Sequence, residues 1–430
     1  MSIARFALLG LVSLALTTAA FGQQPGHTPT NPGTPWVQLA KLSTLNPYAP
    51  RIGGSIAISG NVAVVGGEYN QEALVYVMPA GGWQNMLPTA SLKASDELAC
   101  GAFGYSVSIS GNTIVVGDPE TYCFHGASGA AFVFVEPPGG WSGTIMQTAT
   151  LTASDGATGD SLGNSVSISS DGNTIVAGAP YQSNQLGAAY VFTKPAGGWA
   201  NATQTAKLTA SDGQANEDFG LAVSTSSSVV AVGSPYETVG ANQGQGAAYI
   251  YVEPPGGWSN AAQTAKLTAS DGQEYDYLGS AISLSGQVLA AGAFDQGPGA
   301  VYVFVESSGG WVNATQTAKL TAAGGNPGDQ LGASVVVSNN FIVAGAPWFS
   351  HSANDLTSPF FHEGTDYIFA KPATGCASET QSAMVTGSDA RFGAYLGSSV
   401  AISGSTVVSG ALFNNYNVGA AYVFTPYVPQ

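Results

Sequence analysis

Acidic residues recur before a series of short alternating segments, and they are the side chains here best suited to chemistry. They comprise Asp155, Asp160, Asp212, Glu217, Asp218, Asp271, Glu274, Asp276 and Asp329. Two such carboxyls could act as general acid and base on a glycoside, and a cation could bind Asp160, Asp218, Asp276 and Asp329. We favour a structural role, because Ser-Asp-Gly is ordinary turn chemistry in which Asp bonds its own backbone and Gly takes a positive φ.

Other reactive side chains give no catalytic pattern. His351 and His362 could hold a metal together with Asp355, but their spacing matches no common ligand set. The sequence has no Ser-His-Asp context, phosphate-binding loop or Cys-x-x-Cys pair. We therefore assign no catalytic residue and no cofactor.

Three cysteines are present, and two of them are expected in loops on one face of the fold. We predict a disulfide between Cys100 and Cys123, because an exported protein meets an oxidising environment. Cys376 is then left over. The alternative is three free thiols, since pairing requires Cα atoms within about 7 Å.

Composition favours an all-β protein. The 57 glycines and the low share of charged residues, 8%, accompany many Val, Ser, Thr, Ala and Tyr residues, which suit short strands joined by tight turns. The net charge of -16 comes from scattered carboxylates. This charge disfavours nucleic acid and anionic membranes as partners.

The first residues resemble a targeting segment. Arg5, the apolar stretch 6–16 and the small residues up to Gly22 predict a signal peptide over 1–22. An uncleaved anchor is the alternative, although a membrane-spanning helix needs about 20 apolar residues. Residues 23–35 are rich in Pro, Thr, Gly and Gln and predict a flexible leader. We expect a soluble monomer, secreted to the extracellular space or periplasm, with no membrane span after cleavage.

The rest of the chain, 36–430, consists of repeats. Five tryptophans recur at roughly fifty to sixty residues, a period typical of propellers and solenoids. Residues 204–252 show one unit, in which four strand patterns are joined by polar turns. Each unit contains a large apolar residue followed by Gly, and the seven pairs are Ile52-Gly53, Phe103-Gly104, Leu162-Gly163, Phe219-Gly220, Leu278-Gly279, Leu331-Gly332 and Leu396-Gly397. This pattern predicts a seven-bladed β-propeller of four-stranded blades.

The two ends of the repeat region complement each other. The chain finishes after the third strand of the last unit, whereas residues 36–45 match a fourth strand that precedes the first unit. We predict that this N-terminal strand completes blade seven and leaves no open sheet edge.

These motifs resemble the FG-GAP repeats of integrin α-chain propellers and of secreted bacterial proteins. The first motif stands as Phe103-Gly104 and Phe219-Gly220, and the second as 178–180 and 345–347, Gly-Ala-Pro. The resemblance implies extracellular recognition through the loop face. Calcium-binding members carry Asp-x-Asp-x-Asp-Gly turns, but in four of the corresponding turns here Asp171 is the only acid. The calcium sites are therefore not transferred, and calcium is not assigned as a cofactor.

One column of the repeat supplies candidate ligand-binding residues. Three residues after the Gly of each second motif stand Tyr69, Glu120, Tyr181, Tyr236, Asp295, Trp348 and Phe413, and Phe294 precedes Asp295. The aromatic members, Phe294 included, could stack on sugars or anchor a protein partner, with Asn184, Gln185, Asn242 and Gln243 as hydrogen-bonding companions. Alternatively the rings fold inward and cover the blade ends.

Three functions are compatible with this sequence. We favour a binding or adhesion module whose partner is a glycan or an extracellular, cell-surface protein. A structural envelope or matrix protein is one alternative. A polysaccharide hydrolase or lyase that uses the acidic inter-blade loops is the other.

Overall fold

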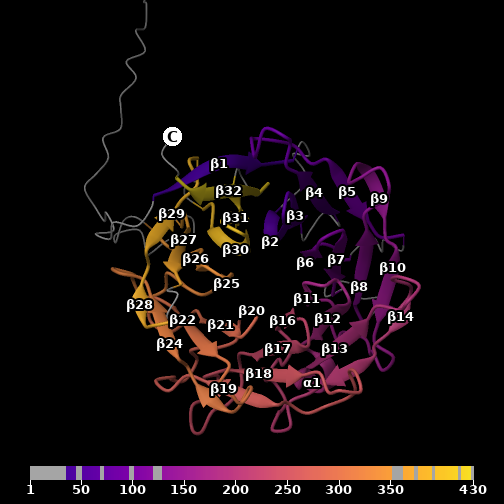
Figure 1. The fold of residues 1–430 in the computed structure, drawn as a ribbon. Helices are drawn as coiled ribbons and strands as arrows, with labels where there is room; N and C mark the ends of the chain where they lie inside the picture. Colours follow the sequence, from indigo (N-terminus) through magenta and orange to yellow (C-terminus); the bar gives the residue numbers. More distant parts are fainter. Residues whose placement is uncertain are drawn as a thin grey trace, which may run out of the picture.

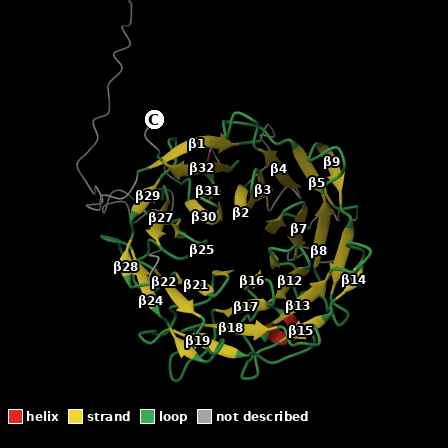
Figure 2. Ribbon diagram, in the orientation of Figure 1, coloured by secondary structure: helices red, strands yellow, loops and turns green. Residues whose placement is uncertain are grey.

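A ring of seven β-sheets forms the molecule (Figure 1). The computed structural model describes residues 35–44, 51–67, 72–95, 101–119, 128–350, 362–371, 376–389, 393–414 and 418–427. The predicted all-β seven-bladed propeller is confirmed, and within the described ranges helix is limited to the short turn α1(Gln182–Gln185) and to Asn414 (Figure 2). The predicted signal peptide and residues 23–34 of the leader lie outside the described residues.

Each blade contributes one strand to each of four concentric layers. The innermost strands are β2(Ile52–Ser59), β6(Ser106–Ser110), β11(Ser165–Ile168), β16(Ala222–Ser226), β20(Ile282–Ser285), β25(Ser334–Val337) and β30(Leu396–Ser403). The second strands are β3(Val62–Gly67), β7(Thr113–Asp118), β12(Thr174–Ala179), β17(Val229–Ser234), β21(Val288–Ala293), β26(Phe341–Ala346) and β31(Thr406–Ala411). The third strands are β4(Glu72–Val77), β8(Ala130–Val135), β13(Ala188–Thr193), β18(Ala247–Val252), β22(Ala300–Val305), β27(Thr365–Ala370) and β32(Ala420–Pro426). The fourth strands are β5(Ala90–Lys93), β10(Ala149–Thr152), β15(Ala206–Leu208), β19(Ala265–Thr268), β24(Ala318–Thr321), β29(Ala383–Val385) and β1(Trp36–Leu42).

The sequence pattern of each layer follows its surroundings. Second strands such as β12 are apolar throughout and fully buried, because the flanking blades cover both of their faces. Innermost strands such as β11 alternate serine with an apolar residue. Their serines reach neighbouring blades: the Ser167 hydroxyl accepts the backbone N–H of Thr225 at 3.0 Å. The alternation predicted from the sequence therefore reflects inter-blade hydrogen bonding as well as packing.

Four blades carry a short fifth strand that the four-stranded prediction did not include. These strands are β9(Gly143–Met146), β14(Ala202–Thr203), β23(Ala314–Thr315) and β28(Glu379–Thr380). Each one precedes the fourth strand of its own blade in sequence, yet it pairs in parallel with the fourth strand of the preceding blade. The outer edges of adjacent blades are thereby joined by backbone hydrogen bonds.

The N-terminal strand β1 closes the ring as predicted. It pairs antiparallel with β32, from Trp36 opposite Pro426 to Leu42 opposite Ala421. It also supplies the side chains that fourth strands supply elsewhere. Lys41 Nζ lies 2.6 Å from Asp389 Oδ2, and Gln38 Oε1 accepts the backbone N–H of Ser388 at 2.8 Å.

Backbone from one blade touches backbone from the next at every blade junction. The second-strand glycine of each blade faces the carbonyl oxygen of the next blade's first-motif glycine, and a Cβ on it would lie 1.9 to 2.1 Å from that oxygen. The seven pairs, in ring order, are Gly66 with Gly104, Gly117 with Gly163, Gly178 with Gly220, Gly233 with Gly279, Gly292 with Gly332, Gly345 with Gly397, and Gly410 with Gly53. No side chain fits in this space, so both motifs require glycine here.

We expect deletion of residues 36–45 to lower the melting temperature by about 10 °C or more, because blade seven loses its fourth strand and the closing contacts. Deletion of residues 23–35 is the matched truncation and should leave the melting temperature unchanged. Thermal denaturation of both proteins measures the difference. Equal melting temperatures would show that β1 does not close the ring.

We expect Gly178→Ala to destabilise the protein by about 3 kcal/mol or more, because the new methyl group would collide with the Gly220 carbonyl at 1.9 Å. Gly197→Ala is the control, because no atom lies within 4 Å of a Cβ placed at that glycine. Denaturant unfolding of both variants gives the two free energies. Similar values would mean that the blades can separate at little cost.

Candidate functional site

Two columns of the repeat meet on the face where the second strands end and the innermost strands begin. One is the aromatic column chosen from the sequence. The other is the residue before each first motif, which takes a positive φ in six blades, at Arg51, Ser161, Asp218, Tyr277, Gln330 and Tyr395. This left-handed conformation is rare for such residues and is held here by the inter-blade loops.

Side chains of the two columns alternate around part of this face. The Tyr277 ring stacks on Phe294 with centroids 5.4 Å apart and meets Tyr236 edge-on at 5.2 Å. Further round, Tyr395 and Phe413 meet edge-on at 5.1 Å, and the Arg51 guanidinium lies 4.8 Å from the Phe413 centroid. Rings on neighbouring blades thus form a belt that shields Phe294 and Phe413 in part.

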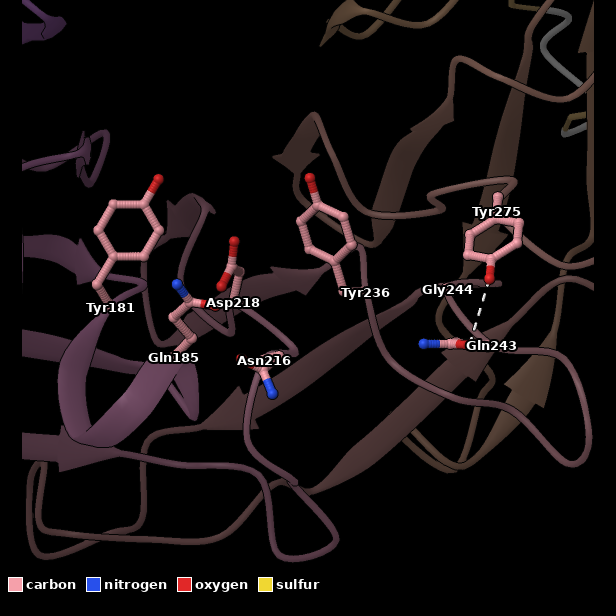
Figure 3. Close-up of a pocket in the computed structure, with 8 residues that line it drawn as sticks. All are labelled: Tyr181, Gln185, Asn216, Asp218, Tyr236, Gln243, Gly244 and Tyr275. Atoms are coloured by element: carbon pink, nitrogen blue, oxygen red, sulfur yellow. Dashed lines mark hydrogen bonds between the residues drawn. The ribbon is translucent and has the colours of Figure 1, made fainter.

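The belt opens into a pocket of about 400 Å³ across blades three, four and five (Figure 3). Four loops contribute its lining. The lining residues are Tyr181, Gln185, Asn216, Asp218, Tyr236, Gln243, Gly244 and Tyr275. The pocket falls in the size range of small-ligand sites, about 300–1,000 Å³.

Asp218 lies at the centre of this pocket. Figure 3 shows its carboxylate between the rings of Tyr181 and Tyr236. The residue is only 8% exposed, and its Oδ1 has no hydrogen-bond partner in the described part of the chain. Burial raises the pKa of this carboxyl to about 6. An ionisable group held this way, without a partner, marks a candidate ligand contact.

Two tyrosines flank that carboxylate and stay partly open to solvent. Tyr181 is 37% exposed and Tyr236 is 44% exposed, and their hydroxyls point to the same side as the Asp218 carboxylate (Figure 3). Burial and the charge of Asp218 raise the pKa of both phenols, so both remain hydrogen-bond donors over the physiological pH range.

Backbone hydrogen bonds fix the loops that present these side chains. The Asp218 N–H donates to the Gln185 carbonyl at 2.9 Å, which ties the blade-three loop to the inter-blade segment. One blade further on, the Tyr275 N–H donates to the Gln243 carbonyl at 3.0 Å, and the Tyr275 hydroxyl reaches Gln243 Oε1 at 3.3 Å. These hydrogen bonds hold the pocket wall in place, and the wall carries the amides of Gln185, Asn216 and Gln243.

The first acid of each Ser-Asp-Gly turn bonds its own backbone, as expected, and also joins two blades. Asp155 binds Lys207 Nζ at 2.6 Å and accepts the Tyr190 hydroxyl at 2.9 Å, both from the next blade. Burial opposes ionisation of Asp155, but these hydrogen bonds outweigh it and hold its pKa below the ordinary value. Three further blades repeat this triad, as Asp212 with Lys266 and Tyr249, Asp271 with Lys319 and Tyr302, and Asp389 with Lys41 and Tyr422.

The second acids are buried and bond to the backbone of their own loops. Asp160, Asp276 and Asp329 each accept the backbone N–H three residues earlier, at 2.7 to 2.8 Å, and Glu217 does the same for Gln214. Asp218 is not equivalent to them, since it stands one place later in its repeat. The described residues contain no group of three or more His, Cys, Asp or Glu that could hold a metal ion.

The remaining candidates divide between a second aromatic cluster and undescribed segments. Trp348 is 41% exposed and stacks on His362 at 5.1 Å. The His362 Nδ1 lies 3.2 Å from the Ser350 hydroxyl. Tyr69, His351, Asp355, Cys100 and Cys123 lie outside the described residues, and so does the predicted disulfide with them.

Sequence reasoning missed several members of the site. Asp218 was named for a cation or for acid–base chemistry, and Tyr275, Tyr277 and Tyr395 were not named. Tyr277 and Tyr395 could have been found from the position that directly precedes each first motif. The aromatic column faces these two residues across the blade junctions. The triads were also missed, although Lys recurs in the fourth strands two places before Thr and Tyr recurs in the paired third strands.

The chain matches the model of a repeat family six times. The family is described as FG-GAP repeat, and the matched residues are 88–134, 145–192, 202–251, 261–304, 314–360 and 380–424. Five of these matches run from the fourth strand of one blade to the third strand of the next, and the match 314–360 ends before the third strand β27. The chain matches no curated protein. The crystal structure of the computationally designed Ika8 protein is similar to it at 15% identity and a TM-score of 0.49, over 90% of this chain and 99% of that chain. Among the described residues, no helix is long and apolar enough to span a membrane.

We expect Asp218→Asn to raise the melting temperature by about 1–2 °C near pH 7.5 and to have little effect near pH 3.5. Burial raises the folded-state pKa of Asp218 from 3.8 to about 6, so the ionised carboxylate destabilises the fold, and this penalty is fully present above the folded-state pKa. As the pH falls from about 6 towards 3.8, the folded protein binds a proton that the unfolded chain does not, and the penalty is lost over that range. Melting curves across this range measure the effect. A loss of stability at the higher pH would mean that Asp218 has a stabilising partner.

Proposed function

Because the chain belongs to the FG-GAP repeat family, we propose that it is an extracellular binding module that recognises a glycan or a cell-surface protein through its loop face. The pocket around Asp218 carries this proposal. Half-exposed tyrosines beside a buried, unpartnered carboxylate form a surface that contributes little to the stability of the fold and is open to a partner.

The chemistry of the pocket wall favours a hydroxyl-rich ligand. Tyrosine rings stack on the apolar faces of sugars, and the three amides can donate to and accept from hydroxyl groups. Sugars present both kinds of surface within one ring. We therefore place a glycan ahead of a protein as the partner, in keeping with secretion to the extracellular space or periplasm.

Binding is better supported than hydrolysis. Glycosidases of both stereochemical types use a pair of carboxyl groups on either side of the scissile bond. Of the eight residues that line the pocket, Asp218 alone carries a carboxylate. The neighbouring Glu217 is engaged by the Gln214 N–H and lies beside Glu237. The acids of the Ser-Asp-Gly turns are used to join blades.

We expect Tyr181→Ala and Tyr236→Ala each to weaken glycan or cell-surface binding by about 1–3 kcal/mol, since each removes a ring that a ligand would contact. Their melting temperatures should stay close to that of the wild type. A glycan array followed by titration of the best ligand, with a pull-down from producing cells in parallel, provides the measurement.

Tyr427→Ala is the matched control, because Tyr427 is 47% exposed and lies after the last strand, outside the pocket. This variant should bind as the wild type does. If the two pocket variants instead lose several degrees of stability and bind normally, the rings are packing elements and the loop face is not the binding surface. Cleavage of an arrayed polysaccharide would favour the hydrolase alternative.

A further inference from the structure

We propose that the pocket across blades three, four and five binds a protonated amino group carried on a sugar ring, so that the ligand is a glycan containing free amino sugars. This inference rests on the proposed function and adds the chemical class of its ligand. It starts from Asp218, the one charged group that the pocket holds.

The Asp218 carboxylate lacks a donor at one of its oxygens. Its Oδ1 is buried without a partner among the described residues, and an unsatisfied buried acceptor costs about 1–3 kcal/mol. Lys266, on the fourth strand of blade four, is already held at 2.7 Å by Asp212 and at 2.6 Å by Glu237. A primary ammonium group brings three N–H donors and a positive charge, and would pair with the carboxylate from the pocket.

The tyrosines on either side suit the same group. An ammonium ion is attracted to the face of a tyrosine ring, and the attraction grows when water is excluded. Figure 3 shows Tyr181 and Tyr236 on opposite sides of the carboxylate, so an ion that reaches Asp218 passes between two rings. These are also the two titratable groups whose pKa values respond to the Asp218 charge.

The rest of the lining distinguishes a sugar from a lysine side chain. A lysine carries its ammonium on an apolar chain, which offers no hydrogen-bonding group to the amides of Gln185, Asn216 and Gln243 on the pocket wall. An amino sugar presents hydroxyl groups around its ring, and these can pair with the amides while one ring face lies on a tyrosine. The protein's net charge of -16 further favours a polycationic glycan over a neutral one.

The ionisation of Asp218 sets the lower pH limit of this interaction. Because burial raises its pKa to about 6, the carboxylate is charged above that pH and the amine would bind there. Below it, both partners are protonated and the attraction is lost. Glu237 pairs with Lys266 and Glu217 lies beside Glu237, and neither of these acids lines the pocket.

The test compares fully deacetylated and fully N-acetylated chito-oligosaccharides of equal length by titration calorimetry at neutral pH and low ionic strength. Acetylation removes the charge and keeps the sugar ring. We expect the wild-type protein to bind the deacetylated oligomer at least about tenfold more tightly, and Asp218→Asn to reduce this preference to about twofold or less.

Asp329→Asn is the matched control. Asp329 is also buried, with an Oδ1 that lacks a partner among the described residues and a pKa raised to about 6, but it lies two blade junctions further on and does not line the pocket. This variant should keep the full preference. If it loses the preference as Asp218→Asn does, bulk charge and not the pocket recognises the amine, and the inference is wrong.

Two further arms separate this inference from the proposed function. If an arrayed neutral glycan binds in a Tyr181- and Tyr236-dependent way, with no preference for free amines, the inference fails and the proposed function stands. If oligolysine binds as tightly as the deacetylated oligomer and both depend on Asp218, the amino-sugar ligand is wrong and a lysine-bearing protein replaces it. If no ligand depends on either tyrosine, both proposals fail together.

Discussion

The contact between backbones at the blade junctions is the constraint on which the structure depends. A glycine in each second strand lies against the carbonyl of the next blade's first-motif glycine, with no room for a methyl group. Serine hydroxyls at the start of the innermost strands reinforce this contact in five blades, as when Ser165 donates to the Gly220 carbonyl at 3.0 Å. The first-motif glycines need φ between 88° and 98° to present that carbonyl. The two sequence motifs therefore supply the two sides of one backbone contact between neighbouring blades.

This backbone contact does not restrict which side chains stand on the loop face. Because main-chain atoms and a few serines hold the blades together near the axis, the residues on either side of each motif need not be conserved in type from blade to blade within the ring. The column before the first motif holds Arg51, Ser161, Asp218, Tyr277, Gln330 and Tyr395 on the same backbone conformation. One blade junction can thus carry an acid between two tyrosines, and another can carry an arginine over a phenylalanine. The backbone arrangement of the blades is the same at both junctions.

The sequence was sufficient to predict the blade architecture, because the same strand pattern recurs in every blade. Seven apolar-Gly pairs predicted seven blades, and the mismatch between the two chain ends predicted closure by β1. The fifth strands were missed because β14 and β23 are two residues long and pair with another blade. For the site, the aromatic column was visible as a column, but the position of Asp218 depended on the left-handed backbone before Phe219 and on the neighbouring loop, which no local pattern shows. The Asp-Lys-Tyr triads join three strands or loops from two blades, so their members are far apart in sequence.

Closure by β1 also imposes an order on folding. The first strand to leave the ribosome pairs with nearly the last, since Trp36 lies opposite Pro426. At about 5–20 residues per second, translation separates the two partners by tens of seconds or more. Throughout that interval the edge of β1 that later pairs with β32 has no permanent neighbour, and exposed strand edges are templates for aggregation. Partial arcs of blades are thus intermediates that the cell must keep apart, and the fold gains its full cooperativity only when the chain is complete.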